Sequence, residues 1–140
     1  MSYHVTVIDD HGVVQYARTY PFRPVPLPRA RFDSADAAIK EKYKRFPGVA
    51  EAWPKVEAPK WYPAVRGLIV GRDNTLWIEI QGAVPGHSWL VLNAKGSPVG
   101  QVKVPENVDL KVADRHNIWG LETDADGLEG IVRYRITLPR

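Results

Sequence analysis

Apolar and polar residues alternate with a period of two along most of this chain, which is the pattern of half-buried β-strands. The alternation is clearest near the C-terminus, where the apolar positions are Val132, Tyr134, Ile136 and Leu138. Turn-forming glycine, asparagine and aspartate separate the runs. Strands are predicted over residues 3–8, 13–20, 65–70, 76–80, 89–92, 99–104, 110–112, 118–122 and 131–138.

The period changes to 3.6 between residues 33 and 46, which predicts one amphipathic helix over about 34–46. Asp33 or Ser34 is the expected N-cap, and Pro47 followed by Gly48 should end the helix. Proline-rich segments at 21–28 and 49–63 flank it and predict an extended strap that leaves the sheet and returns. Trp53 and Trp61 are expected to hold the returning part in place.

One segment of the chain returns after 42 residues: residues 68–77, which end in Leu-Trp, resemble residues 110–119, which end in Ile-Trp. A second pair, residues 5–12 and 89–96, is offset by 84 residues, which is twice that spacing. Repeats of roughly 40 to 45 residues built from short strands are typical of β-propeller blades. Trp77 and Trp119 occupy equivalent positions, and both are expected to pack between neighbouring sheets.

Grouped by this repeat, the strands predict an all-β fold, a partial β-propeller of about two and a quarter antiparallel four-stranded blades with one inserted helix. A single domain, 1–140, would hold the outer hairpin of one blade (3–20), the strap and helix (21–63), a complete blade (64–105) and three strands of the next (108–138). Such an arc is open, so apolar flanks and strand edges would be exposed.

Four segments carry a family resemblance: residues 73–77, 89–96, 102–105 and 132–138. The amino-acid sequences of these segments resemble those of a group of bacterial six-bladed β-propeller proteins related to the NHL-repeat class. The resemblance implies the propeller fold and brings no assigned reaction with it. A chain of 140 residues is shorter than a six-bladed wheel requires, and it lacks the export signal that many members of the group carry.

Composition narrows the classes of partner. The net charge of +3 and the absence of long runs of like charge argue against a nucleic-acid partner. The chain has no cysteine, which excludes disulfides and thiolate metal sites. Neither a signal peptide nor a membrane span is predicted, so as written the chain is expected to be cytoplasmic.

Candidate chemistry is sparse, and no catalytic residue or cofactor is predicted. Glu79, Glu122 and Asp124 follow repeated strands and are the available ligands for a divalent cation, as in a lactonase-like propeller hydrolase. The segment 124–129 is expected to be a hairpin turn instead of a calcium loop. A second alternative is an anion-binding module built from the basic residues Lys103, Lys111, Arg133, Arg135 and Arg140.

The favoured interpretation is a non-catalytic binding or assembly module, a homo-oligomer or a chain completed by a missing propeller half. Its carriers would be the strand edges at residues 3–8 and 132–138, which can extend a neighbouring sheet through main-chain hydrogen bonds. The predicted interface residues are Tyr3, Val5, Val7, Val132, Tyr134, Ile136 and Leu138.

Overall fold

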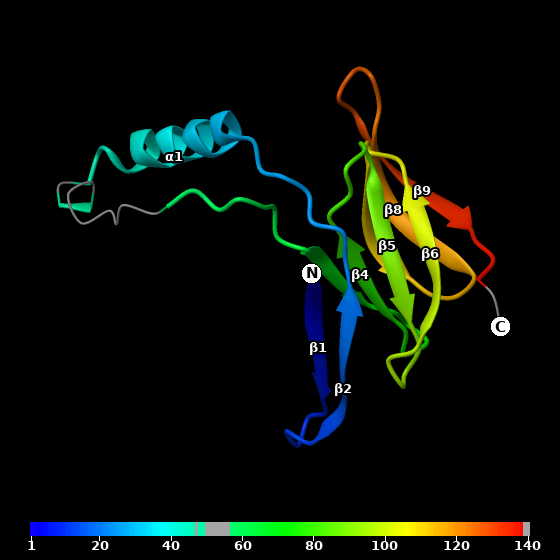
Figure 1. The fold of residues 1–140 in the computed structure, drawn as a ribbon. Coiled ribbons are helices and arrows are strands. Elements are labelled where there is room, and N and C mark those ends of the chain that lie inside the picture. The colour runs from blue at the N-terminus through cyan, green and yellow to red at the C-terminus, as the bar shows by residue number, and fades with distance from the viewer. Residues whose placement is uncertain (47, 50–56, 139–140) are drawn as a thin grey trace. The chain divides into compact units, whose positions relative to one another are not determined.

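The computed structural model describes residues 1–46, 48–49 and 57–138 (Figure 1). The chain divides into two compact units, one formed by Met1–Arg23 with Pro63–Arg140 and the other by Pro24–Tyr62. All the described strands belong to the first unit, and the long helix among the described residues belongs to the second. The second unit coincides closely with the proline-rich excursion predicted over 21–63.

The first unit contains three antiparallel sheets of two, four and three strands. The hairpin consists of β1 (Ser2–Ile8) and β2 (Val14–Pro21). The central sheet has the order β3 (Val65–Val70), β4 (Leu76–Ile80), β5 (His87–Leu92) and β6 (Pro98–Val104). The C-terminal sheet has the order β7 (Val108–Ala113), β8 (Asn117–Thr123) and β9 (Glu129–Arg135). The predicted all-β class and the division into three antiparallel sheets are confirmed.

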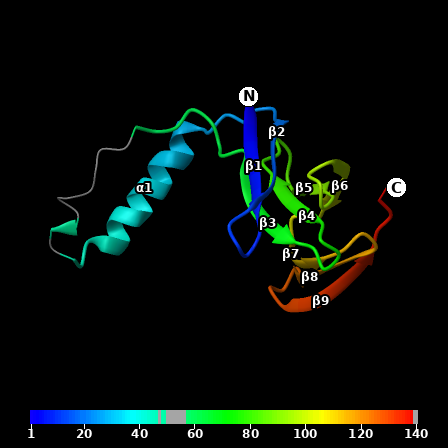
Figure 2. The same cartoon turned by 90° about the horizontal axis from the view of Figure 1, so that it is seen from below.

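Both faces of the central sheet are apolar and both are used. Successive side chains of a strand point to opposite faces of the sheet. On β4, Trp77 therefore points to one face, and its neighbours Leu76 and Ile78 point to the other. Ile78 packs with Leu92 and Tyr20 of the hairpin, and this cluster forms the first core. The second core lies on the opposite face, between the central and C-terminal sheets, and contains Trp77, Trp89, Val91, Val104, Val108, Leu110, Ala113 and Ile118. Figure 2 shows the resulting succession of hairpin, central sheet and C-terminal sheet.

Trp77 is the largest fully buried side chain, and its only polar atom is satisfied locally. Its Nε1–H donates to Thr75 Oγ1 at 2.9 Å, and the Thr75 hydroxyl donates to Asp73 Oδ1 at 2.6 Å. Burying an indole without such a partner would cost free energy, so the Asp-x-Thr-x-Trp spacing suits this position.

Two main-chain donors join the turn after β3 to the turn after β7. Arg72 N donates to Ala113 O at 3.0 Å, and Arg115 N donates to Asp73 Oδ2 at 3.0 Å. Asp73 and Arg115 are 42 residues apart, so the same turn of two successive repeats makes the contact. The central and C-terminal sheets are therefore joined by the repeated turn as well as by the core.

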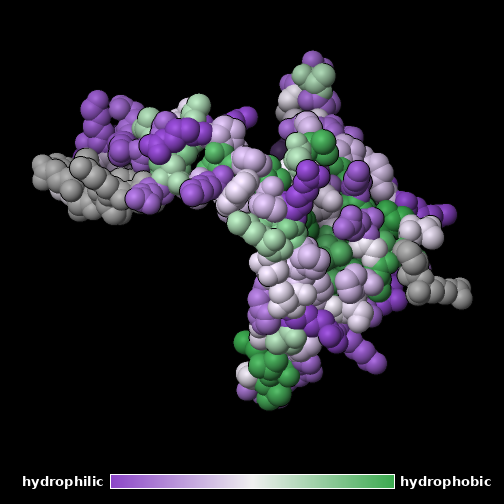
Figure 3. Space-filling view, in the orientation of Figure 1, coloured by the Kyte–Doolittle hydropathy of each residue, from purple (hydrophilic) through white to green (hydrophobic). Residues whose placement is uncertain are grey.

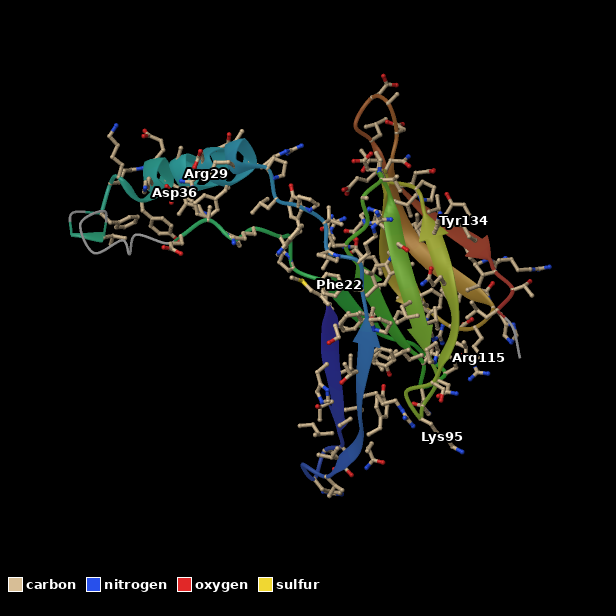
Figure 4. The ribbon with its side chains drawn as sticks, in the orientation of Figure 1. Phe22, Arg29, Asp36, Lys95, Arg115 and Tyr134 are labelled. Atoms are coloured by element: carbon tan, nitrogen blue, oxygen red, sulfur yellow. The ribbon has the colours of Figure 1, made fainter. Side chains whose placement is uncertain are left out.

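The hairpin is held on the central sheet through the turn between β5 and β6. The Tyr20 hydroxyl donates to Gly96 O at 2.5 Å, and Arg18 Nε donates to Lys95 O at 3.0 Å; Figure 4 marks Lys95 in this turn. Gly96 has a φ of 75°, and a Cβ built on it would lie 2.6 Å from the Tyr16 ring. Only glycine allows both the turn and the close approach of the hairpin.

The helix α1 (Arg29–Tyr43) begins and ends earlier than the predicted 34–46. Its N-cap is Pro28, which makes no side-chain capping bond and whose carbonyl accepts from Arg31 N at 3.0 Å. Asp33 lies inside the helix and pairs with Arg29 at 2.9 Å. The prediction placed the start at a polar cap, whereas the rigid proline and the good helix formers after it start the helix one turn sooner.

Short antiparallel contacts close the second unit on itself. Leu27 N donates to Lys60 O at 3.1 Å, and Tyr62 N donates to Val25 O at 2.9 Å. Pro26 and Trp61 form the main-chain bridge between these bonds. The Trp61 side chain is 38% exposed, so the anchoring role expected for it stays a prediction, and Trp53 lies outside the described residues. In the described part of the chain, no helix combines the length and the apolar character needed to cross a bilayer.

Replacing Trp77 with alanine is expected to lower the free energy of unfolding by about 3–5 kcal/mol, because it empties the centre of the second core. Trp119→Ala is the repeat-matched control and should cost markedly less in the isolated chain, since Trp119 keeps part of its surface in solvent. Urea unfolding followed by circular dichroism measures both. Equal losses would show that the two tryptophans are equally covered.

Candidate binding surface

A groove runs along the outer edge of β1, between that strand and the face of β3 and β4. It consists of two adjoining hollows of about 530 Å³ and about 460 Å³, which share Val7, Ile8 and Leu76 among their lining residues. Leu68 lines the first and Val70 the second. We call this surface the β1 groove, lined by Val5, Val7, Ile8, Leu68, Val70 and Leu76.

The β1 groove carries uncovered aliphatic side chains beside polar ones such as Asp9, Gln15 and Asn74. Leu68 is 62% exposed, Val70 is 78% exposed and Ile8 is 60% exposed. Figure 3 shows the hydrophobic tip of the hairpin, where Val13 and Val14 join Ile8. Large apolar side chains exposed side by side are unusual on a surface that meets only water, and they indicate an interaction site.

The open main-chain edge of β1 is the second feature of this groove that suits binding. Among the described strands β1 pairs with β2 alone, so its other edge is open. An open edge presents unpaired N–H and C=O groups to any extended segment that lies beside it. Apolar side chains next to an open edge are the combination that strand addition uses.

The outer face of the C-terminal sheet is a second apolar surface. Across the strands Trp119 pairs with Val112 on one side and Arg133 on the other, and Leu121 pairs with Ile131. Ile131 is 83% exposed and Val112 is 39% exposed, while Trp119 is partly exposed. We call this surface the Trp119 face, formed by Val112, Trp119, Leu121, Ile131 and Arg133. Trp119 was expected to pack between two sheets, and among the described residues no second sheet covers it.

Most of the predicted interface side chains pack against the cores of the first unit instead of pointing to solvent. Tyr3 and Val5 pack against the first core, and Val132, Ile136 and Leu138 pack against the second. Tyr134 donates its hydroxyl to Glu122 Oε1 at 3.3 Å (Figure 4). Val7 alone of the set lines both hollows of the β1 groove. The edge strand β9 also ends at Arg135, so the predicted edge at 132–138 is only partly a strand.

Tyr3 illustrates how firmly the hairpin is packed. Its ring stacks on Tyr20 with centroids 5.6 Å apart. Burial, followed by the neighbouring charge of Tyr20, raises the pKa of the Tyr3 phenol to about 12. The Tyr3 side chain therefore serves the docking of the hairpin, and the open part of β1 is its main chain and the residues from Val5 to Ile8.

The three acids named as metal candidates are not brought together. Glu79 is buried on β4, where Oε1 lies 2.7 Å from His87 Nδ1 and 3.3 Å from an Arg66 guanidinium nitrogen. Asp124 Oδ1 accepts from the main-chain N–H groups of Asp126 and Leu128, both at 2.9 Å, which makes the segment a turn as expected. Among the described residues no group of three or more acidic or histidine side chains is arranged to hold a metal ion.

Glu79 and His87 form a structural link instead. His87 Nε2 lies 3.2 Å from Glu106 O, so the ring joins β4 to the segment that leads into β7. At the equivalent position one repeat later the chain has Leu121, on the uncovered Trp119 face, so this polar link is not repeated. Trp89 Nε1, beside this link, is buried and has no hydrogen-bond partner among the described residues.

The basic residues of the anion-binding alternative are dispersed. Lys103 belongs to β6, while Arg133 and Arg135 belong to β9 and Lys111 is paired with Asp109 at 2.5 Å. Arg140 lies outside the described residues. Only Arg133 and Arg135 share a strand face, and that face also carries Ile131, which mixes charge with apolar surface.

Comparison with protein-family models, with curated proteins and with solved structures finds no match to this chain. The resemblance to six-bladed propellers therefore depends only on the four sequence segments named above.

The β1 groove exists only while the hairpin is docked, and Gly96 controls the docking. Gly96→Ala should loosen the hairpin by about 1–3 kcal/mol, because the methyl group would meet the Tyr16 ring and alanine disfavours a positive φ. Amide hydrogen exchange of β1 and β2 measures this. Gly127→Ala, at a positive φ of 81° with open space around it, is the control for backbone strain alone. Unchanged exchange in Gly96→Ala would contradict the docking described here.

The link between repeats should weaken in acid. Although burial alone would raise it, hydrogen bonds from Thr75 and Arg115 lower the pKa of Asp73 below its usual range. A depressed folded-state pKa stabilises the protein above the unfolded value of about 3.9, and that contribution is lost as the pH falls through the folded value.

Asp73→Asn should therefore cost about 1 kcal/mol at neutral pH, a figure reduced for the partial exposure of the carboxylate, and the difference from wild type should shrink in acid. Urea unfolding at neutral pH and at acidic pH measures this difference in the free energy of unfolding. Asp10→Asn, at a side chain 86% exposed, is the control and should match wild type. A difference that grows on acidification would contradict the assigned direction.

Proposed function

We propose that this chain is a non-catalytic binding and assembly module, whose three sheets are successive parts of a β-propeller that is completed by copies of itself or by a partner chain. The sheets would correspond to half of one blade, one whole blade and three strands of the next. Supporting this are the 42-residue repeat, the 2, 4 and 3 grouping of strands and the turn-to-turn contact of Asp73 with Arg115.

The observation that carries the proposal is a difference between equivalent residues. Trp77 is completely buried, and Leu110, on the sheet that covers it, is only 6% exposed. Their counterparts one repeat away are Trp119, which is partly exposed, and Leu68, which is 62% exposed. The chain thus contains one satisfied contact between repeats and both halves of the same contact left open. The Trp119 half lies on the outer face of the C-terminal sheet, and the Leu68 half lies beside the hairpin, which covers that face only in part.

Catalysis is not favoured by the described residues. The buried carboxylate Glu79 is occupied by His87 and Arg66, and the larger hollow of the β1 groove is lined mainly by aliphatic side chains. In the smaller hollow the carboxylate of Asp9 accepts hydrogen bonds from His11 N, Val13 N and the Gln15 side chain, and the Thr75 hydroxyl is bonded to Asp73 and Trp77. A hydrolase needs converging polar groups around a pocket. An uncovered apolar face and an open strand edge suit protein association instead.

The mass of the protein in solution tests the proposal. Size-exclusion chromatography with light scattering, over a hundredfold range of concentration, should show a discrete multiple of 15.8 kDa that dissociates on dilution. Calorimetry with calcium, magnesium, manganese and zinc is the companion measurement and should show no heat of binding. A well-folded monomer at every concentration would contradict self-completion, and stoichiometric metal binding would favour the hydrolase alternative.

A further inference from the structure

We infer that two copies of this chain associate head to tail, with the Trp119 face of one copy seated in the β1 groove of the next. This inference rests on the proposed assembly function and names its surfaces. It commits to a second copy because the chain itself already contains both complementary surfaces.

The internal contact between the central and C-terminal sheets is the template. There, the face of β4 that carries Trp77 lies on the face of β7 and β8 that carries Leu110 and Ile118. The repeat places Trp119 at the position of Trp77 and Leu68 at the position of Leu110. Since Leu68 pairs with Ile78 across β3 and β4, it lies on the hairpin side of the central sheet, away from Trp77.

The Trp119 face therefore points out of the C-terminal end of the stack, and the face that carries Leu68 points toward the hairpin, which covers only part of it. The Trp119 face is equivalent to the Trp77 face of the central sheet, which covers Leu110. The β1 groove contains Leu68, which is equivalent to Leu110 on the surface that covers Trp77. Bringing them together between copies repeats a packing that the chain already makes once within itself. Different surfaces meeting in this way give a heterologous contact, which closes into a ring or continues as a filament.

The hairpin limits how far the neighbour can extend. It already covers the part of this face around Ile78 and Leu92, while Leu68 and Val70 remain open beside β1. The neighbour therefore occupies the β3 side of the face, next to the open edge of β1. Ile131, at 83% exposed, is the apolar residue of the Trp119 face with most to gain from this burial.

Charge supports the same pairing. The β1 groove is lined at one end by Asp9, and exposed Asp10 follows it in the turn. The Trp119 face carries Arg133 and Arg135 on the same side of β9 as the single acid Glu129, and the nearby Asp109 is paired with Lys111, so basic charge predominates there. Opposite charges on two apolar surfaces favour their encounter and disfavour pairing of either surface with its own kind.

Two lysine substitutions test the contact. Ile131→Lys damages the Trp119 face and Leu68→Lys damages the β1 groove, and both residues are exposed enough that the monomer should fold normally. Each variant alone should be monomeric, with self-association weakened at least about tenfold, as for the loss of a central interface residue. Val84→Lys, at a loop residue 68% exposed, is the matched control and should assemble like wild type.

Mixing the two variants is the decisive step. An equimolar mixture should form a one-to-one dimer of about twice 15.8 kDa and nothing larger, because only one intact groove and one intact face remain to meet. Light scattering on the mixture, with circular dichroism on each variant as the check of folding, measures this. The result would separate the head-to-tail contact from a symmetric contact, in which the mixture gains nothing.

Cross-linking gives a readout that does not depend on folding differences. The chain has no cysteine, so Leu68→Cys and Ile131→Cys each introduce a unique thiol. A short bismaleimide should join the two variants to each other in preference to joining either to itself. Homodimers of Leu68→Cys as the main product would overturn the inference.

The outcomes also separate this inference from the function on which it rests. A wild-type multimer that survives both lysine substitutions would overturn the head-to-tail contact and leave self-assembly in place. A multimer that dissociates in the single variants but does not re-form in their mixture would do the same. A wild-type protein that is monomeric throughout the concentration range would overturn the head-to-tail contact and self-completion, and would leave completion by a partner chain as the form of the proposed function that stands.

Discussion

The packing of the central sheet against the C-terminal sheet is the contact on which the rest of this structure depends. It buries Trp77 completely and brings Trp89, Val91, Leu110 and Ile118 into one core. Three-stranded and four-stranded antiparallel sheets are stable only when an apolar face is covered, so neither sheet would persist alone in water. The turn contact between Asp73 and Arg115 sets where along their length the sheets meet.

The same physical constraint accounts for the surfaces left open. A repeat that buries one face against its neighbour must also present an equivalent face at the end of the array, unless a terminal unit differs from the others. Here Trp119 and Ile131 remain exposed on the outer face of the C-terminal sheet, and Leu68 and Val70 remain exposed on the part of the central sheet that the hairpin leaves open. Among the described residues, the exposed faces beside Trp119 and Leu68 carry large apolar side chains and not the polar surface that caps a terminal repeat.

The buried polar contacts are specific to single positions and do not recur with the 42-residue repeat. Thr75 and Asp73 satisfy the indole of Trp77, whereas Glu79 joins His87 and Arg66 across three strands. These groups bind one another, which leaves no converging set of free polar side chains in the described core. The β1 groove and the Trp119 face are therefore the features of the first unit that suit the proposed association.

The sequence alone determined the strands, their grouping into sheets and the period of the repeat, because alternation and turn chemistry are local properties that neighbouring residues settle. It could not decide which of two apolar faces is covered. On β9 both Val132 and Ile131 are apolar, and only the stacked sheets show that Val132 faces the core and Ile131 faces outward. The start of α1 at Pro28 and the pairing of Glu79 with His87 were likewise decided by contacts that a linear pattern does not contain. Burial depends on elements distant in sequence, and that is why the candidate surface emerged only from the tertiary structure.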